Sequence, residues 1–298
     1  MMAAATLYGL PPTDGAQWWS TDPNLTCTSM HALIYEVPLS SGGMGFACGV
    51  TGTFLCLAAG GNWTTSIRVA GPSSGAIGVQ YAFYDQEGNP VSLDTVSNSA
   101  PASGAGFSVA LGANQPSELQ ILGRSFDSPG HKTTQTGSVF GIFLCADPNV
   151  CATVVPQLLY SFVPAEPWSI SVPIAWDTTF SFLQPSGIST KWSAAGIQDA
   201  THLISFAIRN QATRATFYTV RIYDRNGSPI AVATTPVIQP AGTRGFLLTD
   251  VISTALPAGI LKVTIEAETR FSALFLQFSG NAATSLQMVS DAVPASTP

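Results

Sequence analysis

Residues 84–91 read YDQEGNPV, and residues 223–230 repeat the pattern as YDRNGSPI. The pair Gly106-Phe107 recurs as Gly245-Phe246 at the same offset in the numbering. Both offsets are 139 residues (223 − 84 and 245 − 106). This spacing is too long for a solenoid or propeller unit and fits two copies of an independently folding unit. The sequence therefore predicts two tandem domains related by internal duplication.

The repeated segment has the residue types of a turn between two strands. Asp85 and Asp224 can start the turn, Gly88 and Gly227 can supply the positive φ, and the proline that follows can open an edge strand. A mechanical role accounts for the repeat, and we expect no metal site there.

Alternation of apolar and polar residues predicts strands in both copies. In the second copy it covers residues 203–208, 218–222 and 261–266, while residues 271–278 are apolar on both faces and indicate a central strand. No long segment has a capped 3.6-residue apolar period. We predict an all-β protein of two antiparallel β-sandwiches. The expected boundaries are an arm at 1–30, domains at 31–152 and 153–285, and a tail at 286–298.

The composition excludes some classes of function. Only 9% of the 298 residues are charged and 46% are hydrophobic. The formal net charge is −6, and it arises entirely before residue 151. Without a Lys/Arg cluster, nucleic acid is not an expected partner. No stretch approaches the roughly 18 apolar residues of a spanning helix, and no secretory signal is visible at the N-terminus.

The five cysteines all lie in the first half. We predict disulfides between Cys48 and Cys56, across an expected hairpin, and between Cys145 and Cys151, around a short loop; buried free thiols are the alternative. Disulfides would indicate an oxidising compartment, and hence an extracellular or cell-surface location. Cys27 is left over and is a candidate for intermolecular pairing, or else a buried thiol.

Tryptophans mark a second candidate surface. Leu33 and Leu159 match at a smaller offset than the two Tyr-Asp segments, so the second copy contains an insertion between these points. The inserted region holds Trp168, Trp176 and Trp192. These side chains form either a contact surface or a seal between the domains. The N-terminal arm carries two more candidates, Trp18 and Trp19.

No motif indicates catalysis. Residues 71–75 match the nucleophile pattern G-x-S-x-G, but they join two expected strands, whereas the motif works at a strand-to-helix turn. The three histidines are scattered. We therefore expect no enzyme, no catalytic residue, no cofactor and no metal.

The segment WTTSIRV at residues 63–69, followed by the Tyr-Asp turn and the Gly-Phe strand, resembles secreted tandem repeat domains of bacterial surface proteins. The resemblance covers residues 31–145 and 158–282. It implies immunoglobulin-like or fibronectin-like sandwiches and an extracellular place, and it transfers no catalytic residues.

The leading hypothesis is a non-enzymatic structural protein that assembles with itself into a filament or surface layer. The arm would add a strand to a neighbour, and Cys27 would lock the contact. The alternatives are a carbohydrate-binding or adhesive module that uses the tryptophans, an accessory subunit of a larger complex, and a viral coat protein.

Overall fold

The computed structural model describes residues 32–38, 44–60, 63–98, 100–125, 134–151, 154, 156–162, 174–179, 189–279 and 282–290. Within these ranges the strands pair antiparallel, and the helices α1 (Pro148–Cys151) and α2 (Leu248–Val251) have four residues each. The predicted all-β class is confirmed.

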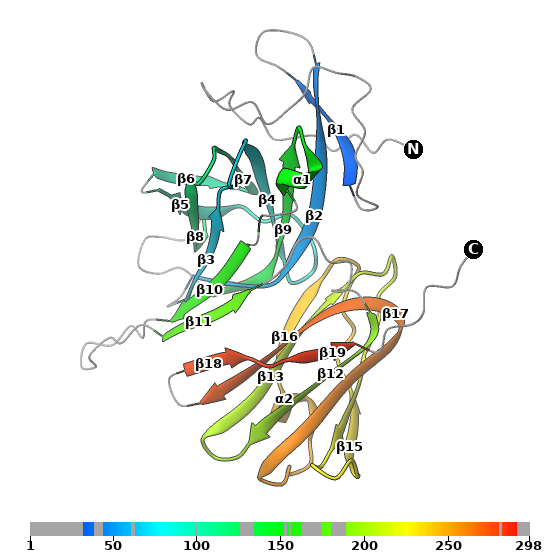
Figure 1. The fold of residues 1–298 in the computed structure, drawn as a ribbon. Coiled ribbons are helices and arrows are strands. Elements are labelled where there is room, and N and C mark those ends of the chain that lie inside the picture. Colours follow the sequence, from blue (N-terminus) through cyan, green and yellow to red (C-terminus); the bar gives the residue numbers. More distant parts are fainter. Residues whose placement is uncertain are drawn as a thin grey trace, which may run out of the picture.

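Residues 32–179 form a first unit of two sheets, drawn in blue to green in Figure 1. One sheet has the order β1 (Ala32–Pro38), β2 (Met44–Ala59), β9 (Gln135–Cys145), β4 (Ile77–Asp85), β7 (Gly106–Leu111). The other has the order β11 (Ile174–Thr179), β10 (Pro156–Phe162), β3 (Trp63–Ala70), β8 (Pro116–Arg124), β5 (Leu93–Ser97), β6 (Ala100–Gly104).

Both sheets of the first unit contribute to one hydrophobic cluster. Phe83 and Phe143 come from the first sheet, and Ile67 and Ile121 come from the second. All four side chains are at most 1% exposed. Burying each large apolar side chain contributes about 1.5–3 kcal/mol, so these buried side chains hold the two sheets together.

Residues 189–290 form the second unit, drawn in yellow-green to red in Figure 1. Its main path runs β15 (Pro229–Thr234), β14 (Thr219–Tyr223), β17 (Gly259–Ser279), β12 (Ser189–Gln198), β19 (Met288–Ser290). Three more strands attach to it: β13 (His202–Asn210) pairs with β17 and with β16 (Thr243–Leu247), and β18 (Ala282–Ser285) pairs with β17.

The 21-residue strand β17 serves two sets of partners. Its first part, up to Glu266, pairs with β12 and β14, and its last part, from Phe271, pairs with β13 and β18. The ladder with β12 jumps from Glu266 to Phe271, where the chain passes from one set of partners to the other.

Many of the strand ladders of the two units correspond to each other. The first part of β17 takes the place of β8, and its last part takes the place of β9. Six ladders of the first unit thus have a counterpart in the second: β3–β8 with β12–β17, β3–β10 with β12–β19, β4–β7 with β13–β16, β4–β9 with β13–β17, β5–β8 with β14–β17, and β5–β6 with β14–β15.

The two Tyr-Asp turns share their geometry but not their place in this order. In each, the Asp carboxylate accepts a backbone N–H at 2.8 Å, and the glycine has positive φ, +86° at Gly88 and +83° at Gly227. The first turn follows β4, whereas the second joins β14 to β15, the counterparts of β5 and β6. The turn chemistry is therefore as predicted, but superposing the two turns does not superpose the ladders.

The Gly-Phe match does occupy corresponding positions. Gly106 of β7 pairs with Ala82, and Gly245 of β16 pairs with Ala207. Ala82 and Ala207 are 125 residues apart (207 − 82), whereas Gly106 and Gly245 are 139 residues apart (245 − 106). The two units therefore differ in the length of the segment between the paired strands.

Two predicted boundaries need correction. β10 and β11 lie beyond residue 152 but pair into the sheet of the first unit, because β10 continues the ladder on β3. The chain enters the second unit only after Thr179. At the other end, the predicted tail from residue 286 includes β19, which pairs with β12. The arm at 1–30 lies outside the described residues.

The core of the second unit contains one unfavourable feature that a single substitution can relieve. Tyr218 is fully buried and its ring meets that of Phe271 edge to face, with ring centroids 4.8 Å apart; its hydroxyl has no partner among the described residues. Desolvation accordingly raises the pKa of Tyr218 well above its usual range. A buried polar group without a hydrogen bond costs about 1–3 kcal/mol.

We predict that Tyr218→Phe raises the free energy of unfolding by about 1 kcal/mol, because it removes an unpaired hydroxyl and keeps the ring. Trp192→Phe is the matched change, because the Trp192 indole N–H donates to the Phe271 carbonyl at 3.0 Å; it should lower stability by about 1–3 kcal/mol. Urea titrations of both variants measure this. A destabilised Tyr218→Phe protein would show that the hydroxyl has a partner.

Candidate binding cavity at the joint between the two units

The turn after β4 packs against the second unit through backbone atoms. The Gln86 carbonyl accepts the Thr243 amide N–H at 3.0 Å. A Cβ on Gly88 would lie 2.7 Å from the Pro240 carbonyl oxygen, and one on Gly242 would lie 2.7 Å from the Gln86 carbonyl oxygen. Real Cβ contacts are not this short, so the approach of the two backbones requires glycine at both positions.

A buried cation lies in the same joint. Arg209 of β13 is 7% exposed, its Nη1 donates to the Ser138 hydroxyl of β9, and its guanidinium lies 5.7 Å from the centre of the Tyr84 ring. Desolvation lowers the pKa of Arg209. Its Nε has no partner among the described residues. The cation–π contact and the hydrogen bond both cross from one unit to the other, so they fix the orientation of the units.

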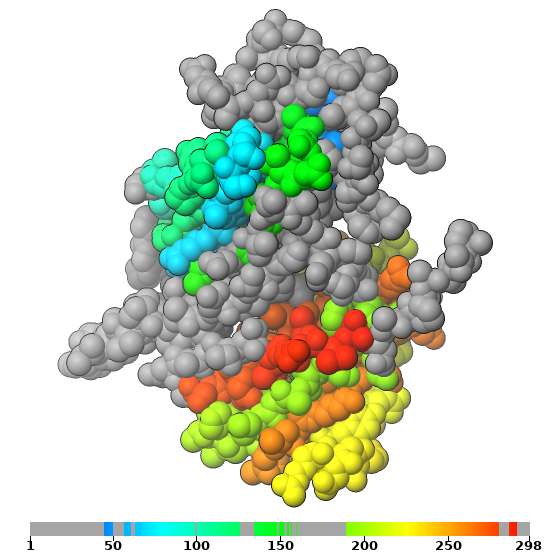
Figure 2. Space-filling model, in the orientation of Figure 1, coloured from blue at the N-terminus to red at the C-terminus, as the bar shows by residue number. Residues whose placement is uncertain are grey.

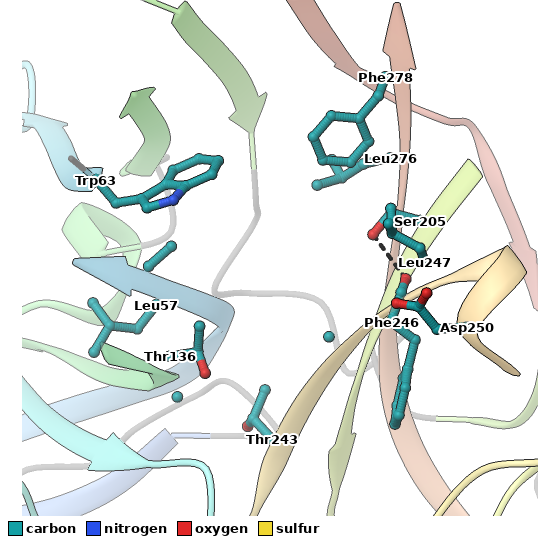
Figure 3. A pocket seen from close by; sticks show the side chains of 13 residues that line it. Leu57, Trp63, Thr136, Ser205, Thr243, Phe246, Leu247, Asp250, Leu276 and Phe278 are labelled. Carbon is teal, nitrogen blue, oxygen red and sulfur yellow. Dashed lines mark hydrogen bonds between the residues drawn. The ribbon is translucent and has the colours of Figure 1, made fainter. Parts of the chain in front are cut away.

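A cavity of about 310 Å³ opens beside these contacts. The first unit supplies the end of β2 and the starts of β3 and β9, and the second unit supplies β13, β16, α2 and the end of β17. Figure 3 shows Trp63 and Leu57 on one wall, with Phe278, Leu276 and Phe246 on the other. The walls are therefore mostly apolar.

Local sequence explains how the apolar wall of the second unit arises. In the last part of β17, Phe271 and Phe275 point into the unit's own core, while Leu274 and Leu276 form a separate cluster with Ala207. Phe278 packs against this cluster and also against the core of the first unit. The sequence predicts a strand apolar on both faces at 271–278, and its second face covers the joint.

Few polar groups line the cavity. Thr243 is 2% exposed, and its hydroxyl has no partner among the described residues. The Ser205 hydroxyl is already engaged, because it donates to the Phe246 carbonyl at 2.9 Å (Figure 3). Asp250 is exposed at the rim. Gly245 also lines the cavity, and a Cβ there would meet no atom within 4 Å.

The predicted cysteine pairs have different outcomes. Cys145 and Cys151 lie at disulfide distance, with a Cα–Cα separation of 6.0 Å, and α1 closes the short loop between them. Cys48 is buried opposite Cys145 in the β2–β9 ladder and is also disulfide-bonded. Cys27 lies outside the described residues.

The predicted hairpin between Cys48 and Cys56 does not exist. Both cysteines lie in the single strand β2. At about 3.3 Å per residue their Cα atoms are roughly 25 Å apart, whereas a disulfide needs less than about 7 Å. The Cys48–Cys56 pairing is therefore wrong; the glycines between them mark a strand, not a turn.

The predicted interaction tryptophans also have different outcomes. Trp192 is 5% exposed and belongs to the core of the second unit, so its assignment to an interaction surface is wrong. Trp176 lies in β11, opposite Tyr160 in the ladder. Trp18, Trp19 and Trp168 lie outside the described residues. The sequence reasoning missed Trp63, which lines the cavity at the joint.

No family model, no curated protein and no solved structure matches the chain. Within the described ranges, neither helix is long and apolar enough to cross a membrane. The same ranges contain no group of three or more His, Cys, Asp or Glu side chains placed to hold a metal ion.

The two matched glycines test the joint. We predict that Gly227→Ala, in a turn with open space, costs about 1–2 kcal/mol for the left-handed backbone alone. Gly88→Ala adds a clash with the Pro240 backbone, so it should cost more and should split a single thermal transition into two as the units uncouple. Calorimetry of both variants decides this, and equal effects would show that the turn does not support the joint.

The cysteine geometry predicts a definite peptide map. Digestion under non-reducing conditions should release a peptide pair joined through Cys145 and Cys151 and no pair joined through Cys48 and Cys56. Mass spectrometry with alkylation before unfolding makes the measurement, and a Cys48–Cys56 pair would contradict the continuous strand β2.

Proposed function

We propose that this chain is a non-enzymatic extracellular structural protein that assembles with itself. The observation that carries the proposal is the distribution of exposed apolar side chains. Six large apolar side chains of the second unit are exposed: Ile197, Phe217, Val232, Val237, Ile260 and Val289. Clustering of this kind on one part of a soluble surface favours a contact with another protein.

These side chains lie on or beside the sheet formed by β15, β14, β17, β12 and β19, which we call the outer sheet. Ile197 and Ile260 lie directly opposite each other in the β12–β17 ladder. Val289 and Val232 lie on the two edge strands, β19 and β15. Figure 2 shows this sheet as successive red, green, orange and yellow bands on one face of the molecule.

Between the apolar side chains the sheet has paired polar groups. Arg221 bonds Glu266 at 2.5 Å, and the Ser193 and Thr264 hydroxyls lie 2.9 Å apart. Because these groups already satisfy one another, covering them costs less than covering free charges. The face therefore suits burial against a second copy.

The joint supports the same proposal. Backbone contacts at Gly88 and Gly242, together with the buried Arg209, hold the two units in one orientation. A fixed orientation lets each chain act as a building block whose geometry sets that of the assembly. The disulfide at Cys145 and Cys151 supports an oxidising, extracellular compartment.

The corresponding ladders support a further part of the proposal. We infer that the units are two β-sandwiches that arose by duplication, aligned by their ladders and not by the Tyr-Asp turns. The resemblance to secreted repeat domains of bacterial surface proteins belongs to the same proposal. The carbohydrate-binding alternative is weaker because Trp192 is buried.

We predict concentration-dependent oligomers of the intact protein in light scattering and regular filaments, layers or shells in negative-stain electron microscopy. Ile260→Lys combined with Val289→Lys should raise the concentration needed for assembly at least tenfold, because two apolar contacts of about 1 kcal/mol each are replaced by charges. Gln120→Lys, at an exposed position of β8 in the first unit, is the matched control and should leave assembly unchanged.

The same experiment can also contradict the proposal. Monomers at every concentration, with and without reductant, would remove self-assembly. Equal assembly by the lysine double variant and by Gln120→Lys would remove the outer sheet from the contact. Loss of polymers only on reduction would instead place the contact at an intermolecular disulfide, as expected for Cys27.

A further inference from the structure

We propose that two copies of this chain pair along β15, so that their outer sheets join across a twofold axis into one continuous sheet. The inference rests on the proposed self-assembly, and it assigns one contact to a strand edge instead of the face of the outer sheet. A twofold contact closes on itself as a dimer. Filaments, layers or shells therefore need a second contact, which the face of the outer sheet can supply.

The edge of β15 has unpaired backbone groups. β15 is the last strand of the outer sheet, and among the described strands it pairs with β14 alone. The Thr235 amide donates to the Tyr218 carbonyl at 2.9 Å. Bonded and non-bonded residue pairs alternate along an antiparallel ladder, so Ala233 also bonds β14, whereas Val232 and Thr234 direct their N–H and C=O groups away from it. Such an edge can accept another strand.

The usual protection against pairing is absent from the middle of this edge. No charged residue lies between Arg225 and Arg244, and charged side chains are a common device against edge pairing. The counterpart strand of the first unit, β6, contains Pro101, which has no N–H to donate. In the second unit the prolines lie at the start of β15, at Pro229, and just beyond its end, at Pro236. They limit the open edge to the residues between them.

Exposed apolar side chains flank the same edge. Val232 is 57% exposed on β15 itself. Phe217 and Val237 are 58% and 51% exposed, and they lie next to the bridged pair Thr216 and Ile238, just past the end of the ladder. A strand added here would cover apolar surface as well as backbone groups. In Figure 2 the yellow end of the second unit, which contains β15, lies far from the first unit, so the first unit does not obstruct a second copy.

The residues of β15 fit a second copy of the same strand. In an antiparallel register centred on Ala233, Val232 lies opposite the partner's Thr234 and each such pair exchanges two backbone hydrogen bonds. Two exposed β-branched side chains then meet, and the small Ala233 meets its own copy where the backbones approach most closely. A register centred on Val232 would instead use Ile230, which lies at the bulge beside Tyr223.

A cysteine substitution tests this register. Ala233→Cys places two thiols opposite each other across the twofold axis, within the Cα separation of about 4.4–6.8 Å that a disulfide needs. After oxidation, mass spectrometry should find a covalent dimer with residue 233 joined to its own copy. Ala231→Cys is the matched control, because residue 231 lies opposite the partner's Thr235, roughly 13 Å from its own copy. It should give no such dimer.

Edge variants test the contact without cysteine chemistry. The starting protein is Ile260→Lys with Val289→Lys, in which larger assemblies are suppressed and the β15 dimer should persist. Adding Thr234→Pro removes an N–H that has no acceptor among the described residues, so the fold tolerates it and the dimer dissociation constant should rise about tenfold or more in light scattering. Thr234→Ala keeps the N–H and is the matched control. Should Thr234→Pro not fold, Val232→Lys against Gln120→Lys makes the same comparison, because it brings like charges together at the contact.

Failure of this inference differs from failure of self-assembly. Monomers of the unaltered chain at every concentration would remove both. Assembly of the unaltered chain, with a monomeric lysine double variant or with equal dissociation constants for Thr234→Pro and Thr234→Ala, would remove only the β15 contact. A loss with Thr234→Pro but no covalent dimer from Ala233→Cys would give the edge to a different strand and overturn the pairing of β15 with itself. A covalent dimer from Ala233→Cys alone, together with a loss specific to Thr234→Pro, establishes it.

Discussion

The last part of β17, from Phe271 onward, must be covered on both faces, and the rest of the structure depends on this constraint. Phe271 and Phe275 need the core of the second unit, and Leu274, Leu276 and Phe278 need something outside it. The first unit faces them with the end of β2 and the starts of β3 and β9. Two units that could each fold around their own core are thereby held together by the hydrophobic effect acting on one strand.

The polar contacts of the joint set the angle between the two units, after apolar burial has brought them together. Burial of apolar area has no direction, so it cannot by itself fix the angle between the units. The close backbone approach at Gly88 and Gly242, the hydrogen bond from Arg209 to Ser138 and its stacking on Tyr84 all depend on orientation. The cavity lies beside these contacts.

Alternation along the chain is enough to predict the all-β class, the strands and the geometry of both Tyr-Asp turns, because each depends on neighbouring residues only. The errors concern pairing over long distances. Glycines between Cys48 and Cys56 suggest a hairpin where β2 continues, and Trp192 gives no local sign that it is buried. A repeated turn is also local, so its recurrence at 84 and 223 cannot locate the corresponding strands. The candidate site is out of reach for the same reason, because Trp63 and Phe278 come from distant parts of the chain and no spacing rule links them. The one usable signal is the two-sided apolar pattern at 271–278, since a second covered face on a two-unit protein points to the joint.

The reach of β17 has a consequence for how the protein folds. Residues 189–198 of β12 pair with residues 259–271 of β17, and the Trp192 indole bonds the Phe271 carbonyl across a sequence separation of 79. Contacts so distant in sequence make a domain slow to fold, because a long loop must close before the contact forms. During synthesis the first unit, which ends with β11, can complete its sheets early, while the second must wait until β17 has been made. Until then its apolar strands are exposed, and they can be covered by a chaperone or by the first unit, which has already folded.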